Sequence, residues 1–123
     1  MESKLFTPVT FGPLTLRNRT IRSAAFESMC PGNAPSDMLL DYHRSVAAGG
    51  IGMTTVAYAA VTQSGLSFDR QLWMRPEIIP GLRKLIDAIH AEGAAAGIQL
   101  GHCGNMSHKS ICGCMPVGAS SGF

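Results

Sequence analysis

Three side chains capable of polar chemistry stand at the ends of stretches with the pattern of strands: the phenol of Tyr58, the amide of Gln99 and the imidazole of His102. An amide both donates and accepts hydrogen bonds, which suits the edge of a flavin or another pyrimidine-like ring. Small residues also occur at the strand ends, where they let a flat ligand approach backbone N–H and C=O groups: Ser23, Ala24, Ala25 and Ala57. Together these residues predict a site for a flat ligand with a polar edge.

Other titratable side chains leave more than one interpretation open. Glu27 either points into a substrate cavity or pairs with Arg22 or another basic residue. His102 is either a site residue or a loop histidine bonded to the backbone. His43 and His90 lie on predicted helices, and we interpret both as structural.

Histidines and cysteines are frequent near the C-terminus, but their spacing is not that of a metal site. The set comprises His102, Cys103, His108, Cys112 and Cys114. It contains no C-x₂-C pair, and an isolated C-x-C is a weak signal. We therefore expect no metal site and interpret these thiols as incidental residues of a flexible loop.

The elements that must position these residues follow from hydrophobic spacing and turn residues. Ser36 suits the N-cap of a helix, and Gly49-Gly50 suits its end. We expect one domain over residues 1–123, with a hairpin at 5–19, strands at about 20–26, 51–58 and 94–100, and helices at about 37–48 and 80–92.

This alternation of strands and helices predicts an α/β fold with a parallel sheet and right-handed crossovers. Two architectures fit, an open doubly wound sheet or a (β/α)₈ TIM barrel. The first strand–helix connection lacks the G-x-G-x-x-G pattern of a dinucleotide-binding open sheet, which favours the opening part of a barrel. In either case ligands bind at the C-terminal ends of the strands, so the candidate residues should share one rim.

Composition narrows the class of protein. Of 123 residues, 46% are hydrophobic and 15% charged, and the net charge is only +2. Basic residues are scattered, so we expect no nucleic-acid partner, and no apolar run is long enough for a membrane span. Without a visible secretion signal we expect a cytoplasmic chain with reduced cysteines. Its apolar character suggests that it belongs to something larger or associates with a partner.

Four motifs in order resemble the old yellow enzyme family of NADH:flavin oxidoreductases, near the branch of the enoate and dienoyl-CoA reductases. The resemblance covers about residues 5–104. The motifs are Leu5-Phe6-Thr7-Pro8 with Gly12 to Arg19, then Ile21 to Glu27, then Ile79 to Leu82 with His90 to Ala94, and Gln99 to Gly104. Family members usually have Pro or Met at the positions of Ala24 and Ala25, and many have Arg at the position of Asn105.

The resemblance implies a flavoprotein that binds FMN and takes hydride from NADH or NADPH for an electron-poor alkene. Backbone groups of Ser23, Ala24 and Ala25 would face the flavin ring, with Ala57 and Tyr58 at its edge and Gln99 on its pyrimidine rim. Glu27 and His102 would lie on the side of the small-molecule substrate. The family's catalytic residues are expected beyond Phe123 and are unknown here.

A complete barrel needs roughly 250 residues, and this chain offers three of eight strands. We expect the N-terminal portion of an ene-reductase-type enzyme that does not hold FMN tightly alone. Two alternatives stay open: a subunit completed by a separate chain or a second copy, and a non-catalytic module that keeps the barrel opening without binding FMN.

Overall fold

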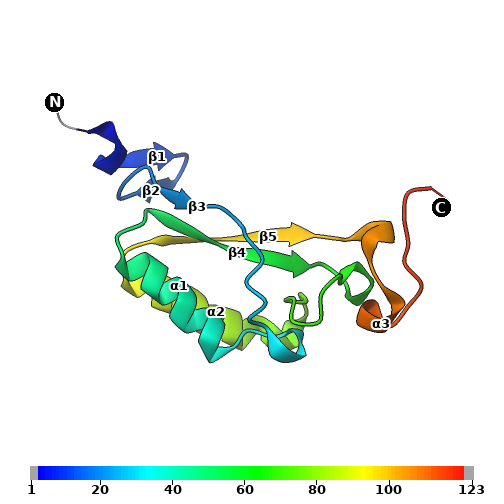
Figure 1. The fold of residues 1–123 in the computed structure, drawn as a ribbon. Coiled ribbons are helices and arrows are strands. Elements are labelled where there is room, and N and C mark those ends of the chain that lie inside the picture. Colours follow the sequence, from blue (N-terminus) through cyan, green and yellow to red (C-terminus); the bar gives the residue numbers. More distant parts are fainter. Residues whose placement is uncertain (1–2, 121–123) are drawn as a thin grey trace.

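The computed structural model describes residues 3–120, and the ends of the predicted domain, 1–2 and 121–123, lie outside the described residues. Figure 1 shows a sheet with two helices along one of its faces. The strands are β1 (Val9–Phe11), β2 (Leu14–Leu16), β3 (Ile21–Arg22), β4 (Met53–Ala60) and β5 (Ala95–Gly101). The helices are α1 (Asp37–Ala48), α2 (Ile79–Ala91) and the short α3 (Lys109–Cys112).

Strands β3, β4 and β5 form a parallel sheet in the order β3-β4-β5. The antiparallel β1–β2 hairpin is a separate sheet at the end where these strands begin (Figure 1). Helix α1 connects β3 to β4 and α2 connects β4 to β5, so each is a crossover between neighbouring parallel strands. This is the predicted β-α-β-α-β order, with α3 and the C-terminal segment at the opposite end (Figure 1).

Both long helices follow the signals in their sequence. The Ser36 hydroxyl caps α1 by accepting a hydrogen bond from the Leu39 amide at 3.1 Å, and Pro80 lies in the first turn of α2. Gly93 takes a φ of +82° directly after α2, a conformation that favours glycine. The helices bury Leu39, Leu85 and Ile89 in one core cluster with the sheet.

Strand β3 is shorter than the predicted 20–26, because only Ile21 and Arg22 pair with β4. The Arg22 guanidinium donates to the Thr55 carbonyl at 2.8 Å, one residue beyond the last paired position of β4. In a continuing parallel ladder this oxygen would accept from the residue 24 amide. The side chain therefore replaces the next backbone hydrogen bond, and Ser23–Phe26 leave the sheet.

Strand β4 contains an irregularity that the alternation of its residues does not predict. The pairing with β5 shifts between Val56 and Ala59. Both residues belong to the core cluster beside the helices, although strict alternation would place residues three apart on opposite faces. The extra residue makes a β-bulge, which re-aims Ala57 and Tyr58 at the end of the strand.

The Arg17 side chain fastens the hairpin to the rest of the fold. Its guanidinium donates to the carbonyl oxygens of Ala47, at the end of α1, of Glu92, directly after α2, and of Ile51, before β4. Asn18 adds a hydrogen bond from its amide to the Gly50 carbonyl at 2.6 Å. A cation at two helix C-termini is favourable for the helix dipoles and satisfies carbonyls that lack partners within a helix.

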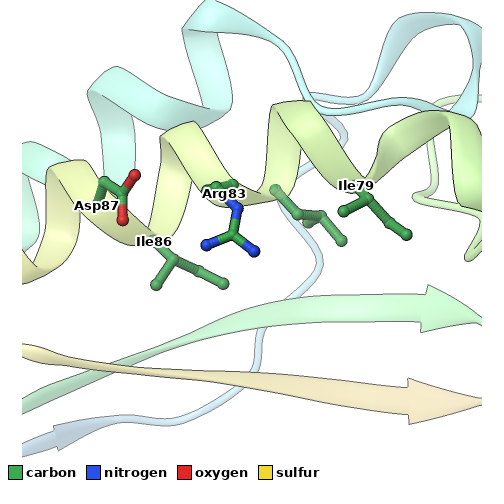
Figure 2. Close-up of a pocket in the computed structure, with 5 residues that line it drawn as sticks. Ile79, Arg83, Ile86 and Asp87 are labelled. Atoms are coloured by element: carbon green, nitrogen blue, oxygen red, sulfur yellow. The ribbon is translucent and has the colours of Figure 1, made fainter.

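The face of α2 that is turned away from α1 carries apolar side chains. Figure 2 shows Arg83 and Ile86 projecting from the same side of this helix, with Ile79 farther along it. They border a shallow groove of about 270 Å³, and a second hollow of about 260 Å³ lies between α2 and β5. Among residues 3–120, no helix combines the length and apolar character needed to cross a bilayer.

Replacing Arg17 by alanine should lower the free energy of unfolding by about 2 kcal/mol, because three carbonyls lose a charged donor. Urea denaturation followed by the fluorescence of Trp73, the only tryptophan, measures this. Arg19→Ala is the matched control, since Arg19 is exposed like Arg17 but donates to none of these three carbonyls. Equal unfolding midpoints for the two variants would contradict a fastening role for Arg17.

Candidate functional site

Strands β4 and β5 end together at one rim, as the parallel topology requires, whereas β3 already ends opposite Thr54. A shallow hollow of about 290 Å³ opens there, lined by Tyr58 from β4 and by Gln99, Gly101, His102 and Cys103 from β5 and the loop after it. The structure therefore brings together the phenol of Tyr58, the amide of Gln99 and the imidazole of His102, as their places at the strand ends predict. The hollow is the candidate site.

Tyr58 is half-buried among aromatic and polar side chains. Its hydroxyl shares a hydrogen bond with the Ser67 hydroxyl, and its ring meets Phe26 and Phe68 edge-on. Burial raises the pKa of the Tyr58 phenol, and the nearby Cys103 thiol raises it further. The phenol is therefore neutral around pH 7 and available as a hydrogen-bond donor.

Gln71 organises the loop behind Tyr58. Its side-chain oxygen accepts hydrogen bonds from the backbone amides of Ser67 at 2.9 Å and Phe68 at 3.2 Å. Gln71 is fully buried, and its Nε2 has no hydrogen-bond partner among the described residues. This loop residue was not expected as part of the site, because its burial depends on the path of residues 62–75.

Gln99 lies near the end of β5 and is exposed at the hollow. Two positions earlier on the same strand face, a Cβ on Gly97 would clash with the Met53 side chain. The opposite face of β5 carries Ala96 and Ile98 against α2. Gln99 therefore projects from the sheet face that the helices do not cover.

The small residues of the first strand end lie beside the Arg22 guanidinium. Arg22 donates to the carbonyl oxygens of Ser23 at 3.5 Å and Ala25 at 3.3 Å, which fixes the course of Ser23, Ala24 and Ala25. Ala57 is buried at the bulge, and its amide donates to the Glu27 carboxylate at 3.2 Å. Hydrogen bonds from Arg22 and to Glu27 thus fix the backbone course of the two segments that are predicted to face the flavin, Ser23 to Ala25 and Ala57 to Tyr58.

The Glu27 carboxylate connects these two segments to each other and to α1 by hydrogen bonds. One carboxylate oxygen accepts from Arg22 at 3.3 Å, from the Ala57 amide and from His43 Nε2 at 3.0 Å, and the Glu27 side chain is 3% exposed. His43 is fully buried, and a 2.8 Å hydrogen bond between its Nδ1 and the Thr54 hydroxyl completes the network. Of the two alternatives for Glu27, the structure shows the pairing. Substrate contact by Glu27 stays a prediction, and these three partners weigh against it.

His102 is exposed at the mouth of the hollow and held on both ring nitrogens. The Gly104 amide donates to Nδ1 at 2.9 Å, which places the ring hydrogen of the neutral form on Nε2, 3.0 Å from the Ser64 hydroxyl. Gly65 packs so closely that a Cβ there would meet the imidazole at 2.8 Å. The imidazole is oriented by its neighbours, and a substrate role for it stays a prediction.

Residues 4–116 match the model of the NADH:flavin oxidoreductase / NADH oxidase family. The chain belongs to that family. It is 51% identical over 100 residues to a 4,4'-dithiodibutanoate disulfide reductase of Rhodococcus erythropolis, a match that spans 81% of this chain and 25% of the relative. It is 37% identical over 106 residues to an NADPH dehydrogenase of Listeria monocytogenes serotype 4b, spanning 83% of this chain and 31% of the relative.

Solved structures of this flavin oxidoreductase family share the fold. An old yellow enzyme homologue from Zymomonas mobilis superposes with a TM-score of 0.89 at 21% identity, over 98% of this chain and 34% of the other. Morphinone reductase superposes with a TM-score of 0.84 at 25% identity, over 91% and 30%. The chain is thus the opening part of the family's barrel and spans about a quarter to a third of these relatives.

The residues present fit one edge of the family's FMN. The exposed Gln99 amide offers a donor and an acceptor at the hollow, as the polar pyrimidine edge of a flavin requires. Gly101 adds no side chain there, and a Cβ at this position would lie only 3.3 Å from the Tyr58 ring. The hollow is thus open to a flat ring beside an amide.

Replacing Glu27 by glutamine should lower the free energy of unfolding by about 3 kcal/mol, because the half-buried Arg22 guanidinium loses its charged partner. The same urea titration measures it, with Glu77→Gln as the control, since Glu77 is exposed. The control should change stability by less than about 0.5 kcal/mol. A Glu27 variant as stable as its control would show that the pairing is incidental.

Proposed function

We propose that this chain forms the N-terminal portion of an FMN-dependent NAD(P)H oxidoreductase that reduces a small organic acceptor. The observation that carries the proposal is the Gln99 amide, exposed in a hollow at the C-terminal rim of the parallel strands of a flavin oxidoreductase family member. The proposed use of NAD(P)H, a reductant held inside cells, supports a cytoplasmic location.

In this proposal Gln99 binds the polar pyrimidine edge of the flavin with its amide. Ser23, Ala24 and Ala25 present backbone groups to the ring, their course fixed by Arg22. Ala57 and Tyr58 border the ring edge, and the Ser67 hydroxyl fixes the orientation of the phenol. Bound FMN would supply the transfer of hydride from NADH or NADPH to the acceptor.

Electron-poor alkenes are the acceptor class that the resemblance to ene-reductases implies. A second class, organic disulfides, is supported by the relative that is 51% identical and is named a 4,4'-dithiodibutanoate disulfide reductase. Either acceptor takes up two electrons and two protons. His102, oriented at the mouth of the hollow, is the residue we place on the acceptor side.

The alternative is a chain that works only after a separate chain or a second copy completes the barrel, or that has lost FMN binding. The apolar groove on α2 and the hollow between α2 and β5 favour completion of the barrel by further elements. If a second copy completes the barrel, flavin binding should depend on the concentration of the chain.

Gln99→Ala should weaken FMN binding at least about tenfold, because the amide's hydrogen bonds to the ring are lost. The measurement uses a chimera in which this chain's matched residues replace those of the Rhodococcus erythropolis relative, titrated with FMN by flavin fluorescence. Gln63→Ala is the control, since Gln63 is an exposed glutamine on the neighbouring loop. Equal affinities of the two variants would remove Gln99 from the site.

The acceptor is identified by following NADH and NADPH oxidation by the same chimera with 2-cyclohexenone or with 4,4'-dithiodibutanoate. Turnover of only one compound assigns the acceptor class. A folded chimera that carries no FMN would contradict the proposed function. The 123-residue chain is titrated beside it, and FMN binding that rises with chain concentration would favour the partner-completed alternative.

A further inference from the structure

Two thiols near the C-terminus lie together outside the flavin site. Cys112 ends the short helix α3 and Cys114 follows after one glycine. Their sulfur atoms are 3.5 Å apart, and the Cys112 sulfur is also 3.1 Å from the Cys114 carbonyl oxygen. The sequence spacing alone gave no reason to expect this contact, because a C-x-C segment in a flexible loop samples many conformations.

The backbone holds the two sulfurs in this arrangement. Gly113 takes a φ of +75°, and its amide donates to the Lys109 carbonyl at 2.9 Å, which closes the helix and reverses the chain. A residue with a side chain would be strained at this φ. The turn therefore fixes the positions of the neighbouring cysteines.

The two thiols differ in their surroundings. Cys112 is 1% exposed and packs in a small core cluster with Ala60 and Leu66, whereas Cys114 is half-buried at its edge. A small reagent therefore reaches the Cys114 sulfur first. The Cys112 sulfur lies directly behind it, within reach of an attack on that atom.

The geometry points to Cys112 and Cys114 as a redox-active dithiol that exchanges with small organic disulfides and closes to an internal disulfide. This site is separate from the hollow lined by Tyr58 and Gln99, and it does not rest on the proposed flavin chemistry. Closing the bond requires the sulfurs to approach from 3.5 Å to about 2.05 Å.

Hydrogen bonds prepare this pair for exchange. The Ser107 hydroxyl, and then groups of Cys114, lower the pKa of the Cys112 thiol, whereas its contact with Cys112 raises the pKa of Cys114. Cys112 is therefore the thiol of the pair that ionises first, and its thiolate is placed to accept the proton of Cys114 as the accessible Cys114 sulfur attacks. Cys30 provides a contrast, since burial raises its thiol pKa to about 11.

The reaction proceeds in two exchanges. The Cys114 sulfur gives its proton to the Cys112 thiolate and attacks one sulfur of the external disulfide, which forms a mixed disulfide and releases the first external thiol. The Cys112 sulfur then loses its proton and attacks the Cys114 sulfur, which breaks the mixed disulfide and releases the second thiol. The protein gives up two electrons and two thiol hydrogens, and the external disulfide leaves as two thiols.

The test treats the 123-residue chain with glutathione disulfide, blocks the remaining thiols with N-ethylmaleimide and maps the peptides by mass spectrometry. Cleavage after Lys109 releases residues 110–123, which contain Cys112 and Cys114 and no other cysteine. We expect this peptide to lose two hydrogens and to carry no label. Cys103→Ser should behave like the wild type, since Cys103 lies at the other site.

Cys112→Ser should stop the reaction at a glutathione adduct on Cys114, and this adduct should persist at least about 100-fold longer than in the wild type, because no internal thiol resolves it. Cys114→Ser should form no internal bond within the peptide. Circular dichroism establishes that each variant is folded. A wild-type chain that keeps glutathione on Cys114, or that carries maleimide on both cysteines, would overturn the proposal.

Discussion

One carboxylate oxygen of Glu27 joins three parts of the fold at the point where the candidate site begins. It accepts hydrogen bonds from Arg22 at the end of β3, from His43 on α1 and from the Ala57 amide on β4. Because the carboxylate is almost fully removed from water, removing any one donor leaves a buried charge less well compensated. The segments predicted to face a flavin ring are therefore held by a network within the protein.

Two arginines five positions apart organise the fold by binding backbone carbonyl oxygens. Arg17 binds carbonyls at the ends of the crossover helices, at the side of the hairpin. Arg22 binds carbonyls of Thr55, Ser23 and Ala25, where β3 ends and the chain leaves the sheet. Five planar donors on a long stem can satisfy several acceptors that the sheet and helices leave unpaired. The same residue type thus fastens the hairpin to the fold and sets the course of the segment that follows β3.

The covered and uncovered faces of the sheet explain why this fold suits a ligand at its rim. The helices bury one face, so the polar and small residues of the other face remain for ligand contacts. The bulge in β4 brings Tyr58 to that side, where Gln99 of β5 also lies. The apolar groove on α2 lies in a chain that spans 34% of a solved structure of the same fold.

The sequence by itself determined the α/β class, the order of the elements and the family, because helical spacing, capping residues and strand composition are local signals. The range of α1 coincides with the predicted 37–48, and the shared rim of Tyr58, Gln99 and His102 follows from parallel topology. Only the tertiary structure decided that β3 ends at Arg22, that Glu27 pairs inward and that Gln71 is buried. These outcomes depend on hydrogen bonds between residues as many as 33 positions apart, such as Arg22 to Thr55, and no local pattern encodes such distant partners.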